Sequence, residues 1–316
     1  MIKIHFLNVG HGDCTIIEHE SGNKTMIDIN NGEEIDEESA TEIIEQLGYS
    51  GEDLIKTIEK TQETPNEILQ KAGYVNTLTN PIQFYKQNYG TSSIFRYIQT
   101  HPDLDHMRGL VGLRKEGISI TNFWDTPHIK AQDDFLFNDE DEWNEYLEHR
   151  NGKRTLAVLN LQRGSTGKYY NLHPEPSLEG DGLYILAPTP ELTSEANRTG
   201  AWNNHSYVLW LAYKGIRVVF GGDAEAEVWD SIVDKYGTGL SCNILKASHH
   251  GRDSGYHQKA VELMNPKYTI VSVGKKPETD ASNKYKQYSP NVWSTRWKGN
   301  ITATIYDNGT YTMTPV

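Results

Sequence analysis

The seven residues 100–106, Thr-His-Pro-Asp-Leu-Asp-His, place the tightest constraint on what this chain can fold into. Four of them are of types that bind metal ions, and they follow directly after the apolar run 93–98. These four are His101, Asp103, Asp105 and His106. Because successive side chains of an extended chain point to opposite faces, the first three can converge on one side of a strand-to-loop junction, while the fourth enters from the next turn. The segment predicts a metal site at a strand end. The alternative is a polar loop whose aspartates cap a helix that starts near Leu104.

Three further segments carry ligand residues at predicted strand ends. Gly221-Gly222-Asp223 and His249-His250-Gly251 each follow a predicted strand, and His205 stands at the head of another. Two neighbouring dications need several protein ligands and a bridging carboxylate, and the chain supplies the right types. Asp223, on a turn where the backbone can approach closely, is the natural bridge. His249 could complete the second site and His205 the first.

Composition favours a folded protein without crosslinks. The chain has 316 residues, of which 36% are hydrophobic, and its two cysteines, Cys14 and Cys242, lie in apolar strand-like contexts typical of buried thiols. No secretory signal is visible and no run approaches the roughly 20 apolar residues that cross a bilayer, so we expect a cytoplasmic protein without a membrane role. The net charge of -13 disfavours nonspecific adhesion to nucleic acid but leaves room for a local basic groove.

Alternation of apolar and polar residues predicts an antiparallel start. The predicted strands are near 2–8, 13–19, 24–29, 93–100, 154–159, 183–187, 206–213, 216–220, 242–247 and 268–273, with a terminal hairpin of 301–305 and 310–313. Helices are predicted over 40–47, 54–59, 65–72, 104–113, 225–236 and 256–264. Two sheets packed face to face with helices outside would satisfy this pattern within a single domain, 1–316. It would carry a helical insertion at 33–90, an acidic insertion at 128–150 and a C-terminal extension at 290–316.

The motifs His-Pro-Asp-x-Asp-His, Asn-x-x-Ser, Gly-Asp and His-His-Gly, in this order, resemble those of the metallo-β-lactamase superfamily. More narrowly, they resemble the ComEC-type hydrolase domain of competence DNA-uptake proteins and their stand-alone relatives. Segments 6–14 and 26–28 are similar to that family's first strands, and the resemblance extends to about residue 273. It implies an α+β fold, a four-layer αββα metallo-β-lactamase-like sandwich with two metal ions along one edge of the sheets.

The resemblance also implies a role for each matching residue. His101 and Asp103 would bind the first metal, Asp105 and His106 the second, and Asp223 would bridge them. His249 would bind the second metal. Asp28 would support the site from behind by orienting a ligand or the loop. Most of the superfamily carries His where Asp103 stands, and an oxygen ligand there shifts the preference toward harder ions, so Zn²⁺ and Mn²⁺ both remain open. His205 would be a ligand or would face the cleft.

These features predict a dinuclear metal-dependent hydrolase in which a hydroxide shared by the two ions attacks the substrate. Asp105 would orient the attacking water and His250 would donate a proton to the leaving group. The expected substrate is a phosphodiester, either a small molecule or a nucleic acid. Arg252 and Lys246 could hold its phosphate, whereas His11 is expected to be merely exposed. The alternatives are an acyl-bond hydrolase for lactones, thioesters or amides, and a non-catalytic metal-binding module that recruits a protein partner through its insertions.

Overall fold

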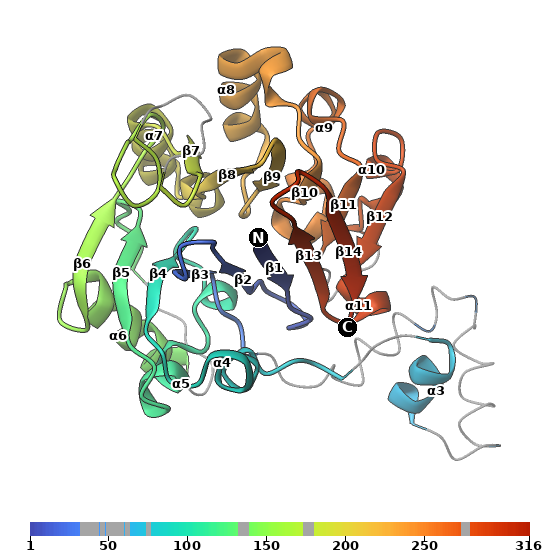
Figure 1. The fold of residues 1–316 in the computed structure, drawn as a ribbon, viewed down its shortest axis with the longest axis horizontal. Coiled ribbons are helices and arrows are strands. Elements are labelled where there is room, and N and C mark those ends of the chain that lie inside the picture. The colour runs from blue at the N-terminus through green and yellow to red at the C-terminus, as the bar shows by residue number, and fades with distance from the viewer. Residues whose placement is uncertain are drawn as a thin grey trace.

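The structure is a computed structural model that describes residues 1–31, 44, 48, 60, 64–73, 77–131, 139–172, 180–272 and 279–316 (Figure 1). Its strands form two sheets, one of eight strands and one of six. The predicted antiparallel start is confirmed, because β1 (Ile2–Phe6) pairs antiparallel with β2 (Thr15–Glu18), and β2 with β3 (Lys24–Ile27). No helix in the described ranges is long and apolar enough to cross a membrane.

The first sheet has the strand order β14-β13-β1-β2-β3-β4-β5-β6. Its remaining strands are β4 (Ile94–Ile98), β5 (Ile120–Asp125), β6 (Thr155–Asn160), β13 (Ile301–Ile305) and β14 (Tyr311–Pro315). From β3 to β6 the strands run parallel, so their carboxyl ends meet at one edge. The terminal hairpin adds to the opposite side, where β13 pairs antiparallel with β1.

The second sheet has the order β12-β11-β10-β9-β8-β7. Its strands are β7 (Leu183–Ala187), β8 (Val208–Tyr213), β9 (Ile216–Phe220), β10 (Ile244–Lys246), β11 (Tyr268–Val271) and β12 (Asn291–Ser294). β9, β10, β11 and β12 are parallel, so this sheet also gathers the carboxyl ends of its strands at one edge. Within this sheet β7 and β10 are buried at every residue and β8 at all but one, because both faces of the sheet are covered there.

Three apolar clusters divide the molecule into four layers. The cluster between the sheets takes Phe6 and Ile98 from the first sheet and Phe220 and Ile244 from the second. A second cluster packs α4, α5 and α6 on the outer face of the first sheet, and a third packs α8, α9 and α10 on the outer face of the second (Figure 1). The helices are α3 (Pro65–Lys71), α4 (Pro81–Tyr89), α5 (Leu110–Lys115), α6 (Asp139–Arg150), α7 (Pro190–Thr199), α8 (Ala226–Tyr236), α9 (Gln258–Met264), α10 (Ser282–Tyr285) and α11 (Thr295–Lys298). The predicted αββα sandwich is confirmed.

The structure differs from the sequence expectation in several elements. The helix expected over 104–113 is a 3-10 turn, Leu104–His106, followed by α5, because Gly109 has a φ of 140° that no right-handed helix contains. Strands β5 and β12 and helix α7 were not predicted. The expected helix over 65–72 is present as α3, whereas those over 40–47 and 54–59 fall mostly outside the described residues.

Candidate metal centre

The predicted ligand residues meet where strand ends of both sheets come together. Segment 100–106 follows β4, Asp223 follows β9, and the pair His249 and His250 follows β10. The backbone amide of Tyr207 donates a hydrogen bond of 3.0 Å to the carbonyl of Thr100, which ties the start of β8 in the second sheet to the end of β4 in the first. Residues that lie far apart in the sequence therefore line one small volume.

The deepest cluster consists of His101, His106 and Asp223, which are at most 3% exposed. The Oδ2 atom of Asp223 lies 3.4 Å from Nε2 of His106 and 3.9 Å from Nε2 of His101. One ligand atom from each residue lies within 4.8 Å of the others. That spacing fits a common metal ion, whose bonds to such nitrogen and oxygen atoms are about 2.0–2.2 Å long.

A second cluster surrounds Asp105. His250 connects it to the first cluster, because this imidazole lies close to both Asp105 and Asp223. Nε2 of His250 lies 3.3 Å from Oδ2 of Asp105 and 3.4 Å from Oδ2 of Asp223. His11, from the loop between β1 and β2, places its Nε2 3.3 Å from the same Asp105 oxygen. Asp13 from that loop also contributes, with Oδ2 at 3.7 Å from Nδ1 of His250. The shared position of Asp223 suits a carboxylate that bridges two ions.

Several buried polar atoms in these clusters have no hydrogen-bond partner among the described residues. They include Nε2 of His101, His106 and His250 and Oδ1 of Asp223, and the same holds for Nδ1 of His250 and Oδ1 of Asp13. An unpaired buried polar atom is costly and rare in folded proteins, and here three imidazole nitrogens and a carboxylate oxygen point into the same volume. Mixed nitrogen and oxygen donors suit Zn²⁺ and Mn²⁺ alike. The residues present therefore fit a divalent metal site.

The charges at the site are strongly coupled. Burial acts to raise the pKa of the Asp223 carboxyl, but the imidazoles of His250 and His106 outweigh it and hold that pKa well below its usual value. Asp105 behaves in the same way beside His106 and His250. Conversely, burial acts to lower the pKa of His106, while Asp223 and Asp28 raise it well above normal. A bound dication would take over the role of these opposite charges, because it competes with protons for the imidazole nitrogens and offsets the carboxylate charge.

Asp28 lies directly behind the first cluster, at the place expected for a supporting residue. It is 1% exposed and accepts hydrogen bonds from the amide and hydroxyl of Thr100, at 2.8 and 2.7 Å, and from Nδ1 of His106 at 2.8 Å. The Thr100 hydroxyl in turn lies 3.0 Å from Nδ1 of His101. Asp28 therefore orients both deep imidazoles, one directly and one through Thr100.

The two adjacent histidines occupy different positions. His250 is 1% exposed and its ligand atom belongs to the cluster, whereas the His249 side chain is 19% exposed and its Nε2 is 3.8 Å from Asp223. Nδ1 of His249 is held by the hydroxyl of Ser254 at 2.7 Å, with Glu225 at 3.6 Å. The geometry thus brings the expected proton donor closer to the metal position than the expected ligand.

Asp103 and His205 lie at the edge of the site. In the described part of the chain, neither belongs to a group of three ligand atoms within 4.8 Å of one another. One oxygen of Asp103 accepts a 2.6 Å hydrogen bond from Lys130, and the other is 3.7 Å from Nε2 of His101. The ring of His205 is buried and stacks on Trp202, and neither of its nitrogens has a hydrogen-bond partner within the described ranges. Their roles as ligands remain predictions.

Sequence reasoning missed the contribution of the first loop. His11, expected to be merely exposed, reaches Asp105, and Asp13 was assigned no role. Lys246, considered as a phosphate-binding residue, is instead buried in an ion pair of 2.7 Å with Asp13. The feature visible in the sequence is the glycine between two potential ligand residues, in His11-Gly12-Asp13. In the structure a Cβ on Gly12 would lie 2.4 Å from the carbonyl oxygen of Asp105. Glycine at this position lets the loop pack against the segment that carries the ligands.

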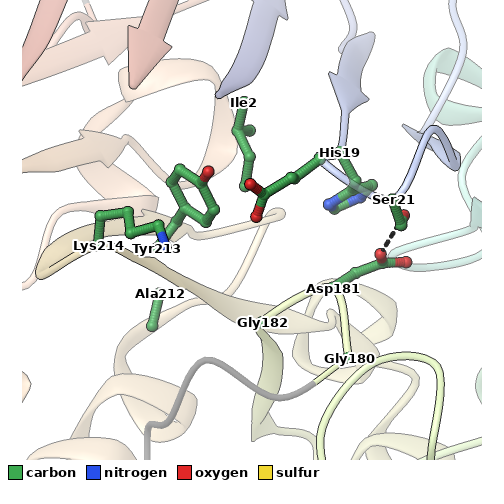
Figure 2. Close-up of a pocket in the computed structure, with 10 residues that line it drawn as sticks. Ile2, His19, Ser21, Gly180, Asp181, Gly182, Ala212, Tyr213 and Lys214 are labelled. Atoms are coloured by element: carbon green, nitrogen blue, oxygen red, sulfur yellow. Dashed lines mark hydrogen bonds between the residues drawn. The ribbon is translucent and has the colours of Figure 1, made fainter. Parts of the chain in front are cut away.

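A separate pocket lies at the far ends of the strands (Figure 2). It has a volume of about 300 Å³ and is lined by Ile2, by residues 19–21 and 180–182, and by residues 212–214. Ile2 begins β1, residues 19–21 follow β2, residues 180–182 precede β7 and residues 212–214 lead from β8 into β9, whereas Asp223 of the metal cluster follows β9. None of the predicted site residues lines this pocket. The ion pair of 3.1 Å between Arg96 and Asp181 stands at its wall.

Comparisons with known proteins give partial likenesses. No family model matches the chain. ComE operon protein 3 from Bacillus subtilis is 28% identical over 120 residues, which cover 38% of this chain and 13% of that protein's length. The structure of CmlA, a diiron β-hydroxylase from Streptomyces venezuelae, is 10% identical with a TM-score of 0.45, over 95% of this chain and 53% of that one.

Two further solved structures show similar values. The long form of RNase Z from yeast has a TM-score of 0.38 at 10% identity, over 95% of this chain and 41% of that one. A Thermotoga maritima protein, described as a candidate Zn-dependent hydrolase of the metallo-β-lactamase superfamily, has a TM-score of 0.33 at 10% identity, over 91% and 85% of the two chains. Such values carry no conclusion about chemistry, so the nature of the site rests on its own geometry.

Proposed function

We propose that this chain is a dinuclear metal-dependent hydrolase of the ComEC-like type that acts on phosphodiesters. The observation that carries the proposal is the convergence of buried imidazole nitrogens without hydrogen-bond partners on the single carboxylate of Asp223. A structural metal site is closed by enough ligands to saturate one ion, whereas these overlapping clusters share a carboxylate between two positions. The edge of the site, at Asp105 and His249, is partly exposed and so offers a substrate access.

In this proposal His101, His106 and Asp103 hold the first ion, and Asp105 and His250 hold the second, with Asp223 between them. His106 is assigned to the first ion and not, as the resemblance implies, to the second, because it shares a cluster with His101. His250 takes the ligand position because its Nε2 lies 3.3–3.4 Å from both Asp105 and Asp223. Two bound ions supply Lewis-acid charge and a water of lowered pKa. Asp28 fixes the orientation of His106 and, through Thr100, that of His101.

His249 then takes the role of proton donor. Its ring lies at the rim beside Asp223, and Ser254 and Glu225 fix the orientation of that ring through Nδ1. A leaving group that departs toward the opening would meet Nε2 of this imidazole. Asp105, whose side chain is 19% exposed, faces the same opening and would orient the attacking water.

Positive side chains at the rim favour a phosphodiester over a neutral acyl substrate. Lys130 contacts Asp103, and Arg252 contacts His11, so two cationic side chains border the clusters in a chain whose net charge is -13. Lysine binds phosphate oxygens as a point charge and arginine can bind them in a bidentate manner. An uncharged lactone or thioester would gain nothing from either residue.

The direct test measures metal content and turnover together. Protein purified without chelator is analysed for metal, loaded with Zn²⁺ or Mn²⁺, and assayed on a bis-aryl phosphodiester, single-stranded DNA and a thioester. We expect two ions per chain and turnover of the phosphodiesters. Asp223→Asn should abolish both, whereas Asp234→Asn, an exposed carboxylate on α8, should change neither. Turnover confined to the thioester would favour acyl hydrolysis, and two bound ions without any turnover would favour a binding module.

A further inference from the structure

The histidines around Asp105 and Asp223 differ in what faces their Nδ1 atom. Nδ1 of His106 lies 2.8 Å from the Asp28 carboxylate, which can only accept. Nδ1 of His101 lies 3.0 Å from the Thr100 hydroxyl, which already donates its hydrogen to Asp28 and so accepts here. Both imidazoles therefore carry a proton on Nδ1, and their Nε2 lone pair is directed at the site when a metal ion is bound.

His250 also has a carboxylate behind its ring, although its Nδ1 has no hydrogen-bond partner among the described residues. The charged group nearest to its Nδ1 is the carboxylate of Asp13, at 3.7 Å, and this negative charge favours a proton on Nδ1. Asp13 is itself held by Lys246, so its position behind the ring is fixed. A carboxylate behind the imidazole is the arrangement that proteins use to prepare a histidine for metal binding.

His11 has the opposite arrangement. The group that faces its Nδ1, at 2.9 Å, is the guanidinium of Arg252. A guanidinium has five N–H donors and no acceptor, so Nδ1 of His11 must accept and the ring proton must be on Nε2. That Nε2 lies 3.3 Å from Oδ2 of Asp105 and therefore presents an N–H, not a lone pair, to this carboxylate.

We propose that His11 is a positioning residue that donates a hydrogen bond to Asp105 and is not a metal ligand, although its ring lies within ligand distance of Asp105 and His250. The proposal rests on the two-metal site proposed above. Arg252, His11 and Asp105 form a directed chain in which each member donates to the next. Among the described residues around Asp105, His11 is then the imidazole that offers it a proton, because His106 and His250 turn lone pairs toward the site.

The backbone holds His11 in place for this role. Asn30 donates from its side-chain amide to the carbonyl of His11 at 2.5 Å and to that of Val9 at 3.2 Å. Gly12, with a φ of 131°, packs against the carbonyl of Asp105. The ring itself is 40% exposed, so its orientation depends on the bond to Arg252 more than on packing. Fixing the Asp105 carboxylate in this way would prepare it for the second ion.

Nitrogen-15 NMR of histidine-labelled, Zn²⁺-loaded protein tests the assignment directly. The signals of His11 among the twelve histidines are identified by their absence in His11→Gln. We expect a neutral ring with the proton on Nε2 and no metal-induced shift, and we expect Arg252→Met to mix the two tautomers. A metal-bound Nε2 on His11 in the unmodified protein would overturn the proposal.

Metal measurements on variants give an independent readout. His11→Ala should still bind two ions per chain at saturation, with affinity for the second reduced by about 10- to 100-fold, the usual effect of removing a residue that orients a ligand. His11→Gln keeps an N–H donor and should recover most of that affinity, and His257→Gln, outside the cluster, should match the unmodified protein. Loss of one ion in His11→Ala, or no change in affinity, would refute the role. Neither measurement depends on turnover, so a failed hydrolysis assay would count against the proposed function alone.

Discussion

Replacement of Asp28 by asparagine should separate metal binding from folding. In the native site one Asp28 oxygen accepts from the amide of Thr100, and the other accepts from the Thr100 hydroxyl and from Nδ1 of His106. Asparagine has the same shape but one oxygen and one NH₂ group. Its oxygen would stay with the backbone amide, because that donor cannot change, and its NH₂ would face the hydroxyl and the imidazole.

This substitution reverses donor and acceptor in the hydrogen bond to His106 and in those that lead through Thr100 to His101. Nδ1 of His106 would have to accept, which moves its proton to Nε2. The Thr100 hydroxyl, which would no longer donate to residue 28, would turn its hydrogen to Nδ1 of His101 and move that proton as well. Each histidine would then have to give up a buried hydrogen bond to bind a metal ion, at a cost of about 1.5 kcal/mol. This is about tenfold per histidine, so we expect about 100-fold weaker metal binding.

The assay is competition for Zn²⁺ or Mn²⁺ with a chromophoric chelator, together with thermal unfolding of the metal-free protein. Because every hydrogen bond is retained in reversed form, the free energy of unfolding without metal should change by less than about 1 kcal/mol. Asp125→Asn is the matched control, since this buried carboxylate also ends a strand and accepts a hydrogen bond, from Tyr146 at 2.9 Å, but lies outside the clusters. A metal affinity of Asp28→Asn within about threefold of the unmodified protein would refute the reasoning.

Three further outcomes are expected. Gly12→Ala should destabilise the protein by about 2–4 kcal/mol in urea unfolding, because the new Cβ meets the Asp105 carbonyl at 2.4 Å and φ is positive, whereas Gly239→Ala, with open space around it, should cost no more than about 0.5 kcal/mol. Burial lowers the pKa of His19 to about 3. As the pH falls, His19 therefore binds a proton in the unfolded chain before it does so in the folded protein. The free energy of unfolding should fall as pH drops below about 6.5, by up to about 1.4 kcal/mol per pH unit. His19→Gln should flatten that slope. Lys130→Gln should lower kcat/KM for a phosphodiester by about tenfold and leave a thioester unaffected; equal effects on both would remove the argument for an anionic substrate.

Elements in which apolar residues recur at a regular spacing could be predicted from the sequence. Elements in which polar residues interrupt that spacing could not. The alternating segment of β1 and the apolar runs of β8 and β9 give clear signals because one or both faces are buried. In β5 the Thr-Asn pair interrupts the apolar pattern, and α7 has few apolar residues along its length. Such segments take their structure from the neighbours they pair with or cover.

The same contrast holds for the site. The four candidate ligand residues of segment 100–106 are visible because they lie close together in the sequence. The contacts of His11 with Arg252 and of Asp13 with Lys246 join residues 241 and 233 positions apart, and no local pattern reports them. The deeper placement of His250 relative to His249 depends on backbone angles, since both residues have positive φ, which the dipeptide alone does not indicate.

These long-range pairs have a consequence for biosynthesis. The lysine and arginine that contact Asp13 and His11, in the loop at residues 10–13, are made more than 230 residues after that loop. Strand β1 likewise waits for β13 before both of its edges are paired. A nascent chain would therefore be unable to hold His11 and Asp13 in their final positions until residues 246 and 252 have been translated.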